Sequence, residues 1–233
     1  MSETNTREVS IDRLLGEDSF EGLVVAGLDL EGADLGGKEL VDCTFERCKL
    51  QGTRWQGSRL DDCRFARCDL TRMQPRGLRA HDVRYVDSKL MGVEWADLGQ
   101  FPRLAFVDCV LDFASFVGLG LRKTDFVGCK IAEANFFDLD LREASFARSD
   151  LQGSIFRGCK LARTDFSAAT GVYFDPAANE ARGAVIPVET AALIAMQFGL
   201  HVAGFTAPAR GLPPAAARAP EQPAAPRGGR ARR

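Results

Sequence analysis

Histidine is scarce in this chain. Its 233 residues include two, His81 and His201, which lie far apart in the sequence. No serine, cysteine or aspartate has a base at the spacing of a known nucleophile motif. Glycine-rich phosphate loops, HExxH and EF-hand sequences are missing as well. We therefore expect no catalytic, cofactor or metal site, and we interpret the protein as a non-enzyme.

Long apolar runs are missing too. No stretch approaches the ~20 apolar residues that cross a bilayer, and the N-terminal segment MSETNTREVS lacks the basic and apolar regions of a secretory signal. The seven cysteines include no Cys-x-x-Cys pair, and such unpaired cysteines agree with a reducing compartment. We expect a cytoplasmic protein without a membrane partner.

A large apolar residue recurs at every fifth position, from Phe20 to Trp95 and again from Phe101 to Phe166. A period of five fits neither a helix nor a flat strand, and a fixed internal period indicates a solenoid. One extra residue separates the two runs, and we expect a local bulge there because the pattern keeps its register.

A second period of four units is superimposed on the first. One column of aromatic residues contains Phe45, Phe65, Tyr85, Phe106, Phe126, Phe146 and Phe166, and another contains Trp55, Trp95, Phe116, Phe136 and Phe156. The position two residues before each large one is usually small, and all seven cysteines lie there. Residues two apart share one face of an extended segment, so both point inward. These patterns predict a four-sided coil of about 20 residues per turn, with the cysteines serving as packing groups.

The segments CTFERCKL (43–50), CRFARCDL (63–70) and ANFFDLDLREASFARSDLQGSIFRGCKLARTDF (134–166) resemble the pentapeptide-repeat family. The resemblance covers roughly residues 18–170. It implies an all-β fold, a right-handed quadrilateral β-helix solenoid, here with a short C-terminal capping helix. Seven and a half turns at the ~4.8 Å strand spacing would give a rod about 36 Å long.

The pattern divides the chain into four parts. We expect an N-terminal cap over 1–19, as a short helix or an irregular segment, and the β-helix over 20–170. A C-terminal strand (170–176) and a helix (187–199) then form a cap over 171–204, and an Ala/Pro/Arg-rich tail over 205–233 is predicted to be disordered. The helix is apolar nearly all round, which predicts burial on more than one side. The resemblance suggests a homodimer through this helix; its candidate contact residues are Leu193, Ile194, Met196 and Phe198.

One branch of the family, the quinolone-resistance type, binds DNA gyrase or topoisomerase IV as an acidic, rod-shaped mimic of DNA. The resemblance therefore implies a non-enzymatic DNA mimic that protects the topoisomerase from gyrase-targeting antibiotics or inhibits it. Since the chain has only the one-residue insertion near residues 97–100, it would match the members of that branch without projecting loops.

The charge distribution agrees with DNA mimicry only in part. Residues 1–204 carry a net charge of −7, but the sum is −7 over 1–37, +4 over 38–90 and −4 over 91–204. We therefore expect the partner-binding carboxylates in the C-terminal coils, with Asp138, Asp140, Glu143, Asp150 and Asp165 as candidates and ordinary solvated corners as the alternative.

Two further interpretations stay open. The alternative to the topoisomerase hypothesis is a general cytoplasmic protein-interaction scaffold with another partner, which the basic middle coils favour. Direct binding of nucleic acid by those coils or by the tail is the weakest of the three hypotheses and is not expected.

Overall fold

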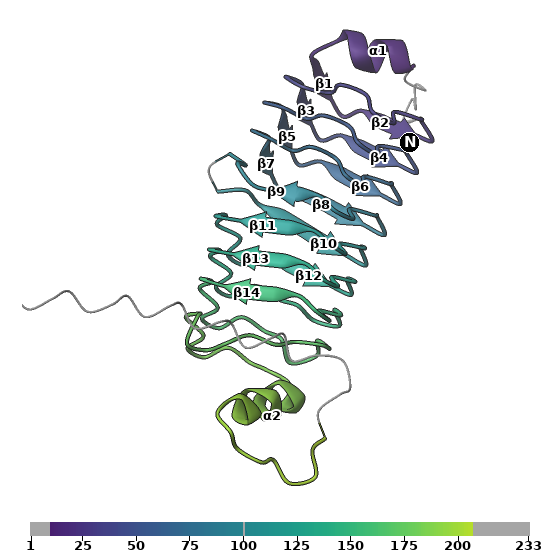
Figure 1. Ribbon diagram of the computed structural model, residues 1–233. Helices are drawn as coiled ribbons and strands as arrows, with labels where there is room; N and C mark the ends of the chain where they lie inside the picture. Colours follow the sequence, from purple (N-terminus) through teal and green to yellow (C-terminus); the bar gives the residue numbers. More distant parts are fainter. Residues whose placement is uncertain (1–9, 100, 207–233) are drawn as a thin grey trace, which may run out of the picture.

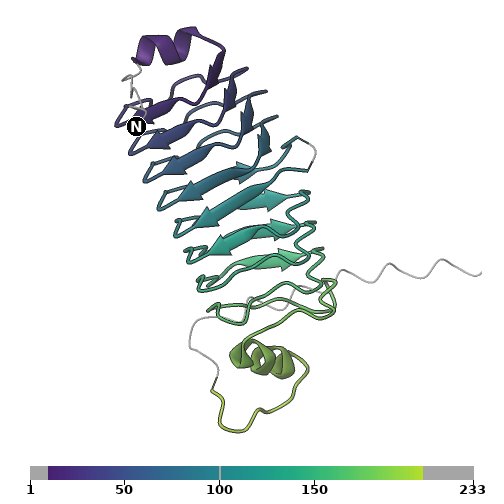
Figure 2. The same cartoon turned by 180° about the vertical axis from the view of Figure 1, so that it is seen from behind.

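The protein is a parallel β-solenoid of about seven turns, closed at one end by a short helix and followed at the other by a second helix (Figure 1; Figure 2, from behind). The computed structural model describes residues 10–99 and 101–206. None of the helices in these ranges is long and apolar enough to span a membrane.

The strands form three parallel sheets, and isolated bridges complete the fourth side. Face 1 contains β1 (Ser19–Glu21), β3 (Glu39–Val41), β5 (Arg59–Asp61) and β7 (Arg79–His81). Face 2 contains β2 (Val24–Ala26), β4 (Thr44–Glu46), β6 (Arg64–Ala66), β8 (Val83–Val86), β10 (Leu104–Val107) and β12 (Asp125–Val127). Face 3 is a ladder of single bridges that begins at Asp29↔Lys49 and ends at Asp150↔Thr170. Face 4 contains β9 (Glu94–Trp95), β11 (Ser115–Val117), β13 (Asn135–Phe137) and β14 (Ile155–Arg157).

The corners explain why short strands alternate with turns. The residue two positions after each large inward-pointing residue has a positive φ at nearly every corner, for example 71° at Gly57 and 50° at Asp62. Glycine and aspartate tolerate this left-handed conformation better than most residues. Most backbone hydrogen bonds run between coils, as from the Leu30 amide to the Lys49 carbonyl at 2.8 Å, and some corners are also closed within a coil, as from the Ala33 amide to the Leu30 carbonyl at 3.0 Å.

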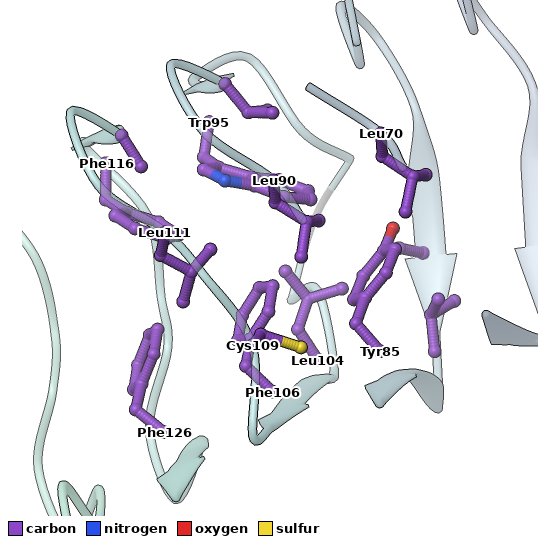
Figure 3. Packing of buried hydrophobic residues seen from close by; sticks show 14 of the residues in the cluster. Leu70, Tyr85, Leu90, Trp95, Leu104, Phe106, Cys109, Leu111, Phe116 and Phe126 are labelled. Atoms are coloured by element: carbon purple, nitrogen blue, oxygen red, sulfur yellow. The ribbon is translucent and has the colours of Figure 1, made fainter. Parts of the chain in front are cut away.

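The aromatic columns lie in the core, as the sequence predicts. The register pairs Phe45 with Phe65 and Phe106 with Phe126, and the stacked rings are 4.9 and 5.1 Å apart between centroids. On the opposite wall, the Phe116 and Phe136 rings stack at 5.2 Å. Rings of the two walls meet edge to face (Figure 3). The four-sided coil with stacked columns is therefore confirmed.

The expectation that Phe101 belongs to the core is wrong. Faces 2, 3 and 4 keep their register across the insertion, since Tyr85 pairs with Phe106, Lys89 with Val110 and Trp95 with Phe116. On face 1, however, Phe101 is 82% exposed, although the Gly99 and Arg103 amides still donate to the Leu78 and Ala80 carbonyls, at 2.9 and 3.1 Å. We call residues 97–99 and 101–103, which lie between β9 and β10, the face 1 bulge (Figure 1). Pro102 is buried and Leu98 packs against the core, so these two residues fill the space instead.

The N-terminal cap is a helix, α1 (Ile11–Gly16), whose first turn is capped by the Ser10 side chain. Leu14 is fully buried and closes the first coil. Lys38 is also buried, and its Nζ donates to the Leu15 and Glu17 carbonyls at 3.2 and 2.6 Å. These carbonyls belong to the end of α1, so a buried lysine ties the cap to the second coil.

At the C-terminal end the coil continues beyond residue 170. Bridges join Lys160 to Glu180 and Asp165 to Val185, so a last, incomplete turn replaces the strand predicted at 170–176. Helix α2 (Val188–Gln197) follows, and Thr190 donates its hydroxyl to the Val172 carbonyl at 2.9 Å. The solenoid thus reaches about fifteen residues further than its sequence boundary.

Candidate functional site

The interior of the rod is filled by apolar side chains, so nearly all of its charged side chains lie on the outer surface. Phenylalanine, leucine and cysteine dominate the buried cluster, which runs from Leu14 to Phe174. Within residues 10–99 and 101–206, no group of three or more His, Cys, Asp or Glu side chains is arranged to hold a metal ion. The outer surface is therefore the candidate functional site.

The five predicted carboxylates do not converge. Asp140 and Glu143 lie on face 1 and at its corner, Asp165 on face 2, Asp150 on face 3 and Asp138 at the corner after face 4. Because the period of five advances the chain by one face per unit, neighbours in the sequence are spread around the rod. The structure brings together only Asp140 and Glu143.

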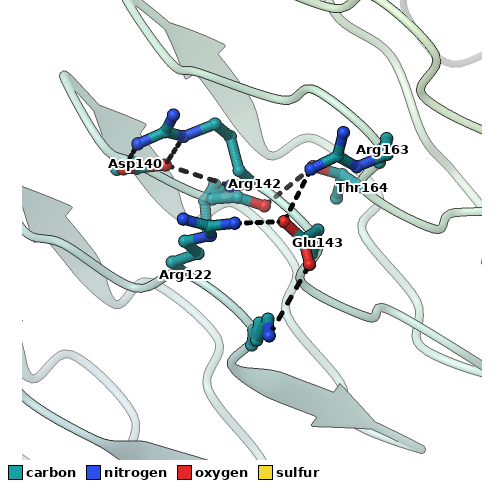
Figure 4. A network of polar contacts seen from close by, with 8 residues as sticks. Arg122, Asp140, Arg142, Glu143, Arg163 and Thr164 are labelled. Atoms are coloured by element: carbon teal, nitrogen blue, oxygen red, sulfur yellow. Dashed lines mark hydrogen bonds and ion pairs between the residues drawn. The ribbon is translucent and has the colours of Figure 1, made fainter.

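These two carboxylates are already paired with arginines (Figure 4). Asp140 accepts two hydrogen bonds from the Arg142 guanidinium, at 2.7 and 2.5 Å. Glu143 lies between Arg163 and Arg122, at 2.7 and 2.5 Å. The hydrogen bond from Arg163, followed by that from Arg122, lowers the pKa of Glu143 to about 2. Both carboxylates stay ionised, but their charge is offset locally, which reduces their value as phosphate mimics.

The other three candidates are carboxylates without a cation within 4 Å in the described ranges. Asp150 accepts a hydrogen bond from the Gln152 amide at 3.1 Å. Asp165 accepts one from the Ser167 amide at 2.8 Å, and hydrogen bonds from Ser167 lower its pKa. Asp138 and Asp150 are exposed, whereas Asp165 is half-buried.

A stronger concentration of negative charge occurs at the N-terminal end, where we did not predict the site. Residues 10–46 contain ten Asp or Glu and two Lys or Arg; we call this segment the acidic end. On face 1 and its corner, four exposed carboxylates have no ion-pair partner in the described ranges: Glu21, Glu39, Asp42 and Asp62, the last from the next coil. The net charge of −7 over residues 1–37 is the feature of the sequence that could have indicated this acidic surface.

The next coils form a basic belt, which we define as residues 47–84. It contains ten Lys or Arg and four Asp or Glu, and its cations occur on all four faces. Several of them reach back to the acidic end, as in the Lys49–Asp29 pair at 2.8 Å and the Arg54–Asp34 pair at 3.5 Å. Arg79 and Arg84 have no carboxylate within ion-pair distance in the described ranges. The belt is the main cationic surface of the rod.

The C-terminal end of the rod exposes apolar side chains. Val188, Phe198 and Leu200 are 87%, 68% and 61% exposed. Leu193, Ile194 and Met196, which we predicted at a dimer contact, are half-buried, and only Thr190 and Ala192 of α2 are buried. Helix α2 is therefore covered on one side only, contrary to the expected burial on several sides.

The cysteines behave as buried packing groups. Each of the seven is buried and free. Except for Cys109, whose thiol contacts the Val107 carbonyl of its own coil, the thiols contact backbone carbonyls of the preceding coil, as between Cys129 Sγ and the Phe106 carbonyl oxygen at 3.4 Å. Burial raises the pKa of Cys159. Serine takes the same slot at Ser149, whose hydroxyl donates to the Phe126 carbonyl at 2.7 Å, which supports a packing role.

The comparisons with known proteins agree with this geometry. The family model described as pentapeptide repeats matches eight copies over residues 39–72 and 134–170. No curated protein matches the chain. Among solved structures, the chain is similar to HetL, a pentapeptide-repeat protein involved in heterocyst differentiation regulation in the cyanobacterium Nostoc sp. strain PCC 7120, with 15% identity, a TM-score of 0.53 and coverage of 72% of this chain and 85% of that one.

It is also similar to full-length QnrB1, a plasmid-mediated fluoroquinolone resistance protein, with 20% identity, a TM-score of 0.48 and coverage of 84% of this chain and 96% of that one. At these identities the likeness concerns the fold alone. The five-residue pattern, the four-sided coil and the matching family model agree with one another, and residues 39–72 and 134–170 are pentapeptide repeats.

Proposed function

We propose that the protein is a non-enzymatic binding partner of a type II topoisomerase, DNA gyrase or topoisomerase IV. In this proposal the rod mimics duplex DNA in the cytoplasm. It occupies the DNA-binding groove of the enzyme, and so protects the enzyme from gyrase-targeting antibiotics or inhibits it. The proposal starts from the family resemblance and rests on the outer surface of the rod.

The observation that carries it is the acidic end. Glu21, Glu39 and Asp42, together with Asp62 from the next coil, lie on three successive coils of one edge. All four are exposed and have no ion-pair partner in the described ranges, although Arg59 is the register partner of Glu39. Coils repeat at ~4.8 Å, while phosphates along one DNA strand repeat at ~3.4 Å of axis. Carboxylates on successive coils can therefore meet several cations of a phosphate-binding groove, and long-range attraction would speed the encounter.

The predicted C-terminal carboxylates take a smaller part in this proposal. Asp138, Asp150 and Asp165 could each contribute one negative charge, on different faces. Asp140 and Glu143 would first have to exchange their arginine partners. We therefore assign the main contact to the acidic end.

Purified gyrase tests the proposal in a supercoiling assay, with and without a gyrase-targeting drug. The full chain should lower supercoiling in the absence of drug or restore it in the drug's presence. The triple variant Glu39→Gln, Asp42→Asn, Asp62→Asn should lose the effect. The matched control Glu94→Gln, Asp97→Asn, Glu133→Gln removes as many charges from around face 4 and should keep it. No effect of the wild-type chain at a large molar excess would refute the proposal.

The alternative partner is another cytoplasmic protein, and the basic belt favours it. Like charges repel, so ten cations within residues 47–84 would oppose entry into a cationic DNA groove. A pull-down with the full chain distinguishes the two hypotheses: topoisomerase subunits among the captured proteins support the first, and their absence supports the scaffold.

We also propose that the protein is a homodimer through α2. The exposed apolar side chains at this end, with the half-buried Leu193, Ile194 and Met196, would be covered by a second copy. Light scattering should report a dimer for the full chain and a monomer for Phe198→Glu. The control Leu15→Glu places the same charge at the opposite end and should stay dimeric. A monomeric wild type at micromolar concentration would contradict this proposal.

A further inference from the structure

The face 1 bulge creates a surface notch that the five-residue pattern does not predict. The notch has a volume of about 460 Å³ and is lined by Arg59, Asp61, Arg79, Ala80, His81 and Phe101. Ala80 stands where the neighbouring coils of face 1 have leucine, at Leu40 and Leu60. The ring of Phe101 lines this space instead of filling the core, and most of the ring is open to solvent.

The walls of the notch combine an aromatic ring with guanidinium groups. Arg59 and Arg79 are direct register partners on neighbouring strands, so their side chains lie side by side on face 1. The Arg59 guanidinium donates to Asp61 at 2.7 Å. Arg79, by contrast, has no carboxylate within 4 Å among residues 10–99 and 101–206. A free guanidinium beside an exposed aromatic ring suits a ligand that has both a phosphate and a planar group.

The cationic lining continues on the other side of the bulge. A second pocket of about 290 Å³ contains Arg84, Arg103, Arg122 and Lys123, with the carboxylates Asp82 and Asp125. The two pockets adjoin, because Arg103 Nη2 lies 3.4 Å from His81 Nδ1. Together they present six cations against three carboxylates, and Arg103 already pairs with Asp82. Arg122 and Lys123 share Glu143, so Arg79 and Arg84 are the two cations in the lining of these pockets that have no ion-pair partner in the described ranges.

We propose that this surface binds single-stranded nucleic acid: one base stacks on Phe101, and the neighbouring phosphates contact Arg79 and Arg84. Proteins that bind single strands combine a stacking aromatic side chain with a cationic track along the backbone. The cations extend past the notch into the second pocket, so the surface suits several linked nucleotides better than one free nucleotide. This function is separate from the proposed topoisomerase contact, which uses the acidic end, and either can hold without the other.

The test uses the full chain and a fluorescent oligothymidylate of about twelve nucleotides, a length within the usual range of single-strand sites. Fluorescence anisotropy should show binding that weakens as salt rises. Phe101→Ala should weaken it about 5- to 150-fold, the range that corresponds to the loss of one stacked base. The matched control is Phe113→Ala, which removes another exposed phenylalanine with a positive φ and should leave the affinity within about twofold.

The phosphate contact has its own pair of variants. Arg79→Gln should reduce the slope of log affinity against log salt by about 0.7, the value for one phosphate contact on a single strand. The control Arg76→Gln removes an exposed arginine three residues away, on face 4. It should weaken binding less than Arg79→Gln does and leave the preference for single-stranded over duplex DNA unchanged. A 2-aminopurine base in the oligonucleotide should lose fluorescence on binding to the wild type, which reports stacking without any substitution.

Four outcomes would overturn the proposal. The first is no binding at about 100 µM protein, the weak end of non-specific affinity. The second is equal loss in Phe101→Ala and Phe113→Ala, which would assign the binding to general charge, including that of the Arg-rich residues 207–233. The third is duplex DNA binding as tightly as the single strand, and the fourth is a mononucleotide binding as tightly as the oligonucleotide.

Discussion

Replacing Phe126 by alanine tests the stacked core most sharply. The Phe126 side chain is fully buried in the middle of the rod. Its ring stacks on Phe106 and Phe146, with centroids 5.1 and 4.8 Å away, and meets Phe116 and Phe136 edge to face at 5.6 and 6.0 Å. The substitution therefore removes four aromatic contacts and leaves a cavity that the rigid coils on both sides cannot close.

The expected loss follows from these contacts. Phenylalanine-to-alanine changes in well-packed cores cost about 3–5 kcal/mol, and each aromatic pair can contribute about 0.5–1.5 kcal/mol of that total. We expect the upper half of the range, about 4–5 kcal/mol, because all four neighbours are aromatic. With a urea m-value of about 2 kcal/mol/M, the unfolding midpoint should fall by about 2 M.

Equilibrium unfolding in urea, followed by circular dichroism, measures this shift. Phe113→Ala is the control, because Phe113 is 61% exposed and its loss should change stability by no more than about 0.5 kcal/mol. A change in m-value would show that the coils no longer unfold together. If Phe126→Ala costs less than about 1 kcal/mol, the stacked column does not hold the rod together.

Three further substitutions test separate parts of the account. Cys129→Ser should cost no more than about 1 kcal/mol in the same urea assay, because Ser149 already fills the equivalent slot in the next coil with a hydrogen bond of 2.7 Å. Lys38→Met should leave the Leu15 and Glu17 carbonyls without their buried donor, cost about 1–3 kcal/mol and speed hydrogen exchange in α1; unchanged exchange would contradict the capping role. Glu143→Gln should destabilise the protein at neutral pH, and because the folded-state pKa is lowered to about 2, the difference from wild type should shrink as pH falls from about 4.5 towards 2. The effect should also weaken with salt, since the pairs are partly exposed, and a difference that grows towards pH 2 would refute it.

The fold could be predicted from the sequence because one period determines both where each side chain points and which residue lies above it. Phe45 above Phe65 and Phe106 above Phe126 follow from a step of 20 residues. At residues 78 and 80 the usual order of a small and a large residue is reversed, and both Leu78 and Ala80 are buried, as the pattern requires. Each coil repeats the same contacts, so every repeat supports the same prediction.

Features that occur once could not be predicted in this way. Phe101 continues the numerical pattern, but the extra residue before it shifts the backbone, and Pro102 and Leu98 take the inner positions. Lys38 occupies a position where most units have a small residue. This exception is the feature of the sequence that could have indicated the hydrogen bonds between Lys38 and the end of α1.

The candidate site was harder to predict than the fold. Counting charges along the chain indicated the sign of each segment, but not how the carboxylates divide among four faces. Asp140 and Glu143 meet Arg142, Arg122 and Arg163 because coils 20 residues apart lie side by side. A side chain that looks free in the sequence can therefore be paired with one from the next coil.

The central claim about function is that the rod occupies the place of DNA on a topoisomerase. The most direct test is competition: labelled duplex DNA is bound to purified gyrase, and the full chain is titrated in. We predict that the chain displaces the duplex, and that Glu39→Gln, Asp42→Asn, Asp62→Asn abolishes the displacement while the Glu94→Gln, Asp97→Asn, Glu133→Gln control does not. Duplex that stays bound at a large molar excess of the wild-type chain would contradict the claim.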